Sequence, residues 1–224
     1  MELKGKIIDF LGDSITEGIG VADMNNRYDQ VMLRTCRLKA VYNYGVSGSR
    51  FAHQTKPSEI PRFDLCFCGR AYDMNPAADI IVVYGGINDF IHGDAPVGGS
   101  GDRTPATFCG AVHFLMNFLK TSYPEKMIVF MTPAHCNYME ELSDARVSDN
   151  PNKRADALPL PDYVKIIKDT AGIYQIPVLD LYADLGIDPN NPADYAQYTA
   201  DGLHFNDAGH HVLAEKLSAF LRSL

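Results

Sequence analysis

The stretch KIIDFLGDSITEG, residues 6–18, decides the fold that this sequence predicts. Its first part, residues 6–11, is a short and mostly apolar run that is typical of a buried strand. Gly12 and Asp13 end this run, and Ser14 then opens a stretch that is compatible with a helix. A serine after a strand is usually a helix cap, but it is also where a nucleophile can stand. The rest of the chain has to separate these two interpretations.

The same order of apolar run and amphipathic stretch recurs along the chain. Strands are predicted at residues 6–11, 40–46, 80–86, 127–133 and 176–181. Helices are predicted at residues 27–39, from Thr104 and Pro105 onward, at 161–175 and after 206. Sequential strand–helix units predict an α/β fold with a mostly parallel sheet and helices on both faces.

The last helix should begin with Asn206 or Asp207 as its cap, because both residue types accept hydrogen bonds from the first turn. Its apolar residues then repeat with a helical period and form one face. We expect His210 and His211, near the start of this helix, to face solvent or to pack locally.

The bulk composition suits one globular domain over residues 1–224. The net charge is −8 and no basic stripe is present, so nucleic acid is not an expected partner. We find neither a secretion signal nor an apolar run of about 20 residues, and therefore expect a cytoplasmic protein without a membrane association. A homo-oligomer is compatible with this size, but no feature demands one.

The five cysteines are expected to be free thiols, because their number is odd and no secretion signal accompanies them. Cys66 and Cys68 stand one residue apart, but no second pair of ligands with metal-site spacing follows. We therefore expect no metal site.

Polar residues follow several predicted strands, at the sheet edge where open α/β sheets bind ligands. They lie in the segments 12–14, 43–50, 86–89 and 201–206. Two segments rich in loop signals, 93–105 and 135–161, also follow buried strands. We expect these two to be rims of an active-site mouth, or simply solvated connections.

One candidate for each role in acyl transfer is present at this edge. Ser14 is the candidate nucleophile and His204 its base, with Asp201 three residues earlier to orient the imidazole. Asn88 offers a side-chain amide, and Gly48 offers an N–H that substrate can approach closely. Together with the Ser14 N–H, these two would form an oxyanion hole.

Each of these residues also has a plain explanation when taken alone. Asn88 could cap a turn, Gly48 could serve a positive φ angle, and His204 could be a buried histidine satisfied by Asp201. All of them falling by chance at one edge of one sheet is much harder to explain. The pattern therefore favours catalysis, with Ser14 as a nucleophile.

Other polar residues stand beside these positions. Asp13 and Asp89 are expected to accept hydrogen bonds from backbone N–H groups and so to fix the loops. Arg50, His92 and His135 follow strand ends near the expected mouth, where they could contact substrate.

Four segments resemble the sequence blocks of the GDSL/SGNH hydrolase family: GDSIT, NYGVSGSR, GIND and DGLH, which together span residues 12–204. The resemblance implies a flavodoxin-like three-layer α/β/α sandwich. It also implies Ser14 as nucleophile, Gly48 and Asn88 in the oxyanion hole, Asp201 and His204 as the remaining pair, and no cofactor. Residues 135–161 match no motif of the family.

The expected activity is a serine esterase that hydrolyses a small-molecule ester through an acyl-enzyme on Ser14. The polar rim segments favour a small polar ester such as an acetylated carbohydrate, with a lysophospholipase or thioesterase as the alternative. An alternative of another class is a non-catalytic carbohydrate-binding relative. Such a relative would be expected to lose Ser14, Asn88 or His204, and all three are present.

Overall fold

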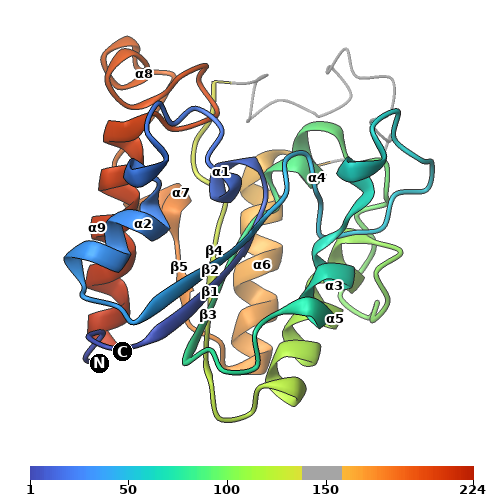
Figure 1. Ribbon diagram of the computed structural model, residues 1–224. Helices are drawn as coiled ribbons and strands as arrows, with labels where there is room; N and C mark the ends of the chain where they lie inside the picture. The colour runs from blue at the N-terminus through green and yellow to red at the C-terminus, as the bar shows by residue number, and fades with distance from the viewer. Residues whose placement is uncertain (138–157) are drawn as a thin grey trace.

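The computed structural model describes residues 1–137 and 158–224 (Figure 1). Its sheet consists of β1 (Ile7–Gly12), β2 (Ala40–Gly45), β3 (Ile80–Tyr84), β4 (Met127–Met131) and β5 (Val178–Leu179). The strand order is β2-β1-β3-β4-β5, and every pair of neighbours is parallel. The predicted α/β fold with a parallel sheet is confirmed.

The helices follow the strands along the chain. They are α1 (Ser14–Glu17), α2 (Tyr28–Thr35), α3 (Phe67–Arg70), α4 (Ile87–His92), α5 (Phe108–Ser122), α6 (Leu160–Tyr174), α7 (Leu181–Asp184), α8 (Pro192–Tyr198) and α9 (Asp207–Ser223). Short 3₁₀ turns lie at Met24–Asn26, Pro61–Asp64 and Ala71–Asp73.

Side chains alternate between the two faces of the sheet, as the period of two residues in a strand requires. In β3, Val82 is buried in the cluster under α2 and α9, whereas Val83 is buried in the cluster under α5 and α6. Both faces are covered, so the strands are apolar throughout. Figure 1 shows α2 and α9 on one side of the sheet and α3, α5 and α6 on the other, which confirms the three-layer sandwich.

Two element boundaries differ from the sequence prediction. The N-cap of α5 is Thr107, whose hydroxyl accepts a hydrogen bond from the Gly110 N–H, so the predicted start at Thr104 is wrong. The N–H groups of Phe108 and Cys109, the first two residues of this helix, donate to the carbonyls of residues 96 and 97, which fixes the later start. At the other end of the chain, the cap of α9 is Asn206, one of the two predicted residues.

His210 is fully buried, so it does not face solvent, which was one of the two placements expected from the sequence. Its Nδ1 accepts a hydrogen bond from the backbone N–H of Tyr28 at 3.2 Å, and the two rings stack at 5.8 Å. Burial lowers the pKa of His210 to about 4, so the ring is neutral near pH 7. The histidine thus joins α9 to the start of α2.

All five cysteines are buried free thiols. In the two ranges that the structure covers, no helix combines the length and the apolar character that a membrane crossing requires.

Candidate active site

The strand order places three loops next to one another at the carboxyl edge of the sheet. Gly12, the last residue of β1, pairs with Gly45 of β2 on one side and Tyr84 of β3 on the other. The three strands therefore end at the same level. Ser14 follows the central one of these strands, whereas Gly48 and Asn88 follow its two neighbours. The sheet itself thus sets these three residues around one point.

Asp13, and not Ser14, is the N-cap of α1. Its carboxylate accepts a hydrogen bond from the Ile15 N–H at 3.0 Å, which leaves the Ser14 hydroxyl free of the capping role. Burial raises the pKa of Asp13 to about 7, although the Ile15 N–H and the nearby His204 and Arg70 act in the opposite direction.

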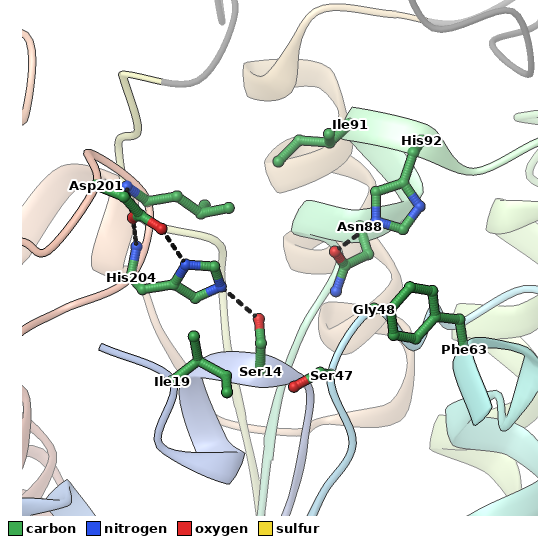
Figure 2. Close-up of a pocket in the computed structure, with 11 residues that line it drawn as sticks. Ser14, Ile19, Ser47, Gly48, Phe63, Asn88, Ile91, His92, Asp201 and His204 are labelled. Carbon is green, nitrogen blue, oxygen red and sulfur yellow. Dashed lines mark hydrogen bonds and ion pairs between the residues drawn. The ribbon is translucent and has the colours of Figure 1, made fainter. Parts of the chain in front are cut away.

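Ser14, His204 and Asp201 form a continuous chain of hydrogen bonds (Figure 2). The Nε2 atom of His204 lies 2.9 Å from Ser14 Oγ, and its Nδ1 atom lies 2.6 Å from Asp201 Oδ2. The backbone N–H groups of Leu203 and His204 donate to Asp201 Oδ1 at 3.0 and 2.8 Å. The carboxylate is thus held in place on both of its oxygen atoms.

The protonation of this chain follows from its partners. Partial burial would raise the pKa of Asp201, but the hydrogen bonds from the His204 ring and from the two backbone N–H groups lower it overall. An ionised carboxylate only accepts hydrogen bonds, so the proton of a neutral His204 lies on Nδ1. Nε2 then presents a lone pair to the Ser14 hydroxyl, as a general base requires.

Three possible donors lie around the Ser14 hydroxyl group. The Ser14 N–H belongs to the first turn of α1 and therefore has no partner within the helix. Gly48 lines the pocket with a φ of +71°, and a Cβ atom there would lie 2.7 Å from the Phe63 ring. Figure 2 shows the nitrogen of the Asn88 amide on the side of Ser14. This nitrogen donates one hydrogen to Ser49 O at 3.0 Å and keeps a second.

These groups line a cavity of about 410 Å³. Its apolar wall consists of Ile19, Phe63, Ile91 and Leu203, and its polar lining includes Ser47 and His92 in addition to the residues above. No residue of the predicted rim at 93–105 lines it; the loop after β2 contributes instead. Of the other predicted rim, residues 138–157 lie outside the described residues.

Asp89 holds the loop after β2 against the start of α4. Its carboxylate accepts hydrogen bonds from the N–H groups of Phe51 at 2.9 Å and Ala52 at 3.1 Å. Burial raises the pKa of Asp89 to about 6, against the effect of these two donors. Asp13 and Asp89 thus both accept backbone N–H hydrogen bonds beside the pocket, the contacts expected of them from the sequence.

The structure corrects or extends the interpretation of three more polar residues. Arg50 is 4% exposed and is not among the described residues that line the pocket. His92 does line the pocket, whereas the ring of His135 packs against Tyr182, with 4.0 Å between the ring centroids and an angle of 35° between the ring planes.

Glu17 was not identified from the sequence as part of the site. It lies one helical turn after Ser14, and its carboxylate accepts a hydrogen bond from the Ser47 N–H at 2.7 Å. A glutamate in a first helical turn is too common to reveal this contact, because Ser47 is 30 residues away along the chain.

Comparisons with known proteins identify the family and the fold of this sequence. The sequence profile of the GDSL-like lipase/acylhydrolase family matches residues 10–212. A solved structure from Lactobacillus plantarum is 32% identical, covers 98% of both chains and superposes with a TM-score of 0.81. A search of curated proteins gives no match.

Two more distant structures share the fold. An acetyl xylan esterase is 21% identical over 95% of this chain and 98% of its own, with a TM-score of 0.61. A two-domain esterase active on acetylated mannans is 18% identical over 99% of this chain and 50% of its own, with a TM-score of 0.62. From the profile that spans nearly all of the sequence, we conclude that the chain belongs to the GDSL-like lipase/acylhydrolase family.

Proposed function

We propose that the protein is a serine esterase that hydrolyses a small polar carboxylic ester, with an acetylated carbohydrate as the leading substrate class. The observation that carries this proposal is the pair of distances at His204. Its Nε2 lies 2.9 Å from Ser14 Oγ and its Nδ1 lies 2.6 Å from Asp201 Oδ2. This is the arrangement in which an imidazole can accept the serine proton while a carboxylate stabilises the resulting cation.

In the first half of the reaction, Ser14 Oγ attacks the ester carbonyl carbon and His204 Nε2 accepts the hydroxyl proton. The tetrahedral oxyanion accepts hydrogen bonds from the N–H groups of Ser14 and Gly48 and from the Asn88 amide. When the intermediate collapses, the bond to the alcohol oxygen breaks and His204 gives its proton to the leaving alcohol. The acyl group remains on Ser14 as an ester.

In the second half, His204 accepts a proton from water as the water oxygen attacks the acyl-enzyme. A second oxyanion forms in the same place, and its collapse releases the carboxylic acid. His204 returns the proton to Ser14 Oγ, which restores the starting state. Asp201 remains an ionised carboxylate throughout and stabilises the imidazolium at each step.

Two observations support a small polar ester. The cavity of about 410 Å³ lies toward the lower end of the range for small-molecule sites. The fold is also that of an acetyl xylan esterase and of an esterase active on acetylated mannans.

The apolar wall favours the second candidate, a lysophospholipase or thioesterase, because Ile19, Phe63, Ile91 and Leu203 could pack against an acyl chain.

The rates of hydrolysis of p-nitrophenyl esters from C2 to C12 distinguish these two candidates. Each CH₂ group that the pocket buries should contribute about 0.8 kcal/mol, or about fourfold in kcat/KM. We expect kcat/KM to be highest for the acetyl ester, and acetyl groups to be released from acetylated xylan or mannan oligosaccharides. A steady rise in kcat/KM beyond C8 would instead favour the acyl-chain hydrolases.

The nucleophile itself is tested by labelling with a fluorophosphonate. The adduct should form on Ser14, and Ser14→Ala should lose both labelling and hydrolysis while its thermal unfolding remains close to that of the wild type. A folded wild-type protein that gives neither an adduct nor p-nitrophenol would contradict the proposal. That result would favour the non-catalytic carbohydrate-binding alternative.

A further inference from the structure

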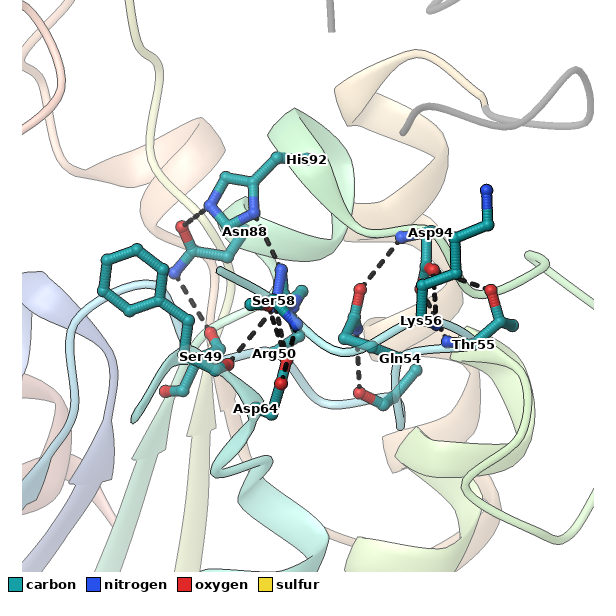
Figure 3. A network of polar contacts seen from close by, with 12 residues as sticks. Ser49, Arg50, Gln54, Thr55, Lys56, Ser58, Asp64, Asn88, His92 and Asp94 are labelled. Carbon is teal, nitrogen blue, oxygen red and sulfur yellow. Dashed lines mark hydrogen bonds and ion pairs between the residues drawn. The ribbon is translucent and has the colours of Figure 1, made fainter. Parts of the chain in front are cut away.

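A series of hydrogen bonds connects the Asn88 amide through His92 to Arg50 (Figure 3). Asn88 Oδ1 lies 2.9 Å from His92 Nε2, and His92 Nδ1 lies 3.0 Å from Arg50 Nη1. Asn88 and His92 are one turn apart on α4, whereas Arg50 comes from the loop after β2. None of these contacts involves the Ser14 hydroxyl group directly.

The direction of each hydrogen bond follows from the chemistry of arginine. A guanidinium group has five N–H donors and no acceptor, so Arg50 must donate to His92 Nδ1. Nδ1 then carries a lone pair, and the proton of the neutral ring lies on Nε2. Nε2–H in turn donates to Asn88 Oδ1. The contact with Arg50 thus selects one tautomer of His92.

This direction also selects one orientation of the Asn88 amide. With Oδ1 on the side of His92, Nδ2 donates to the carbonyl oxygen of Ser49 at 3.0 Å and directs its second hydrogen toward the pocket. A flipped amide would place Nδ2 against the Nε2–H donor and Oδ1 against the Ser49 carbonyl. Both hydrogen bonds would be lost, and the pocket would face a group that cannot stabilise an oxyanion.

Arg50 is itself held rigidly. It is 4% exposed, and its Nη2 donates to Ser58 Oγ at 2.9 Å and to Phe63 O at 3.3 Å. It also forms an ion pair with Asp64 Oδ1 at 3.4 Å. The Arg50 carbonyl accepts a hydrogen bond from the Phe67 N–H at 2.9 Å. The series of hydrogen bonds that leads to Asn88 therefore begins at a cation whose position is fixed by several partners.

We propose that His92 and Arg50 are positioning residues that orient and polarise the Asn88 amide of the oxyanion hole. Every hydrogen bond in the chain donates in the same direction, from the Arg50 cation through His92 and Asn88 toward the site of the developing negative charge. Hydrogen bonds aligned in this way strengthen one another in a low-dielectric interior. The proposal rests on the proposed function, in which Asn88 donates to the oxyanion.

A double-mutant cycle with p-nitrophenyl acetate tests this inference. His92→Leu should lower kcat by about 10-fold to 100-fold, which does not exceed the loss expected when a whole oxyanion donor is removed. The KM should stay within about twofold of the wild-type value. In the Asn88→Ala background the same substitution should cost almost nothing further, because the residue through which His92 acts is already gone. A purely structural role would lower kcat equally in both backgrounds.

His92→Gln provides a conservative rescue, because a glutamine amide can accept from Arg50 with its oxygen and donate to Asn88 with its nitrogen. It should recover most of the activity that His92→Leu loses. The matched control is His53→Leu at an exposed histidine of the loop after β2, the loop that also holds Arg50, and it should leave kcat unchanged. If thermal unfolding shows that His92→Leu is not folded, His92→Ala takes its place in the cycle.

An unchanged kcat in folded His92→Leu, or an equal loss with and without Asn88, would overturn the positioning role. The failure of the proposed function looks different. Wild-type protein would then not label on Ser14, or Asn88→Ala would keep the wild-type kcat. Either result removes the basis of the inference before His92 is changed.

Discussion

The carboxylate of Glu17 accepts hydrogen bonds from both the backbone N–H and the hydroxyl group of Ser47. Glu17 ends the short helix that Ser14 begins, and Ser47 precedes Gly48. This contact therefore joins the loop of the proposed nucleophile to the loop of a proposed oxyanion donor. It fixes a distance on which the proposed reaction depends.

Glu17→Ala should lower the free energy of unfolding by about 1–3 kcal/mol, because it leaves the half-buried Ser47 N–H without its charged acceptor. It should also lower kcat more than it changes KM, since the Gly48 N–H would no longer be held opposite Ser14. Urea unfolding and p-nitrophenyl acetate kinetics measure the two effects.

Arg62→Ala is the matched control for this prediction. Arg62 donates to both oxygens of Glu17, to Oε1 at 2.6 Å and to Oε2 at 3.1 Å, but its side chain is 50% exposed, so this ion pair should contribute little to stability. If both variants lose the same stability and activity, the contact between Glu17 and Ser47 is not what matters.

Asp201→Asn should lower kcat by about 10³-fold to 10⁴-fold with little change in KM. The asparagine amide can donate to His204 Nδ1, and the ring proton would then lie on Nε2 and point toward Ser14. The proposed base would then have no lone pair for the serine proton. Steady-state kinetics between pH 6 and 9 measure the loss, and a kcat within tenfold of the wild type would argue against this role of Asp201.

Gly48→Ala should lower both stability and kcat. The residue has a φ of +71°, where a side chain costs about 1–2 kcal/mol, and the new Cβ would lie 2.7 Å from the Phe63 ring. Relief of that clash would shift the Gly48 N–H away from the oxyanion site. Gly99→Ala is the control, because a Cβ there meets nothing within 4 Å, and it should behave as wild type.

His210 should make the protein less stable in mild acid. Its pKa is about 4 in the folded protein and about 6.5 when unfolded, so between these values the unfolded chain binds more protons. Stability should therefore fall as the pH falls from 6.5 to 4, by roughly 3 kcal/mol from this group.

Urea unfolding of His210→Gln at several pH values tests this prediction. The variant lacks the titrating group, so its stability should depend less on pH over that range than the stability of the wild type. His211→Gln, at the exposed neighbouring histidine, should keep the wild-type dependence. If the stability of the wild type and of His210→Gln changes with pH in the same way, burial does not lower the pKa of His210 as described.

The sheet could be predicted from the sequence because its central strands are covered on both faces. Val82 and Val83 lie on opposite faces and both are fully buried, so the run that contains them is apolar throughout. The edge strand β5 is a weaker case, since only Val178–Leu179 pairs where residues 176–181 were predicted. Apolar character extends beyond the residues that have a neighbouring strand to pair with.

The residues around Ser14 could also be predicted, because each comes directly after a strand or in one short loop. The partners that support them could not. The contact between Arg50 and His92 depends on the path of the loop after β2, and the burial of His210 depends on how α9 packs on α2. Both are tertiary contacts between segments that are far apart in the sequence, and the local pattern of one segment does not indicate that it contacts the other.

The burial of every native thiol has a practical consequence for following this protein in solution. Burial raises the pKa of Cys66, Cys68 and Cys109, which disfavours the reactive thiolate, so alkylating reagents should modify the native chain only as fast as it opens. Ile19 lies at the pocket with 45% of its surface exposed. Ile19→Cys should therefore accept a fluorophore selectively, beside the proposed binding position of the ester.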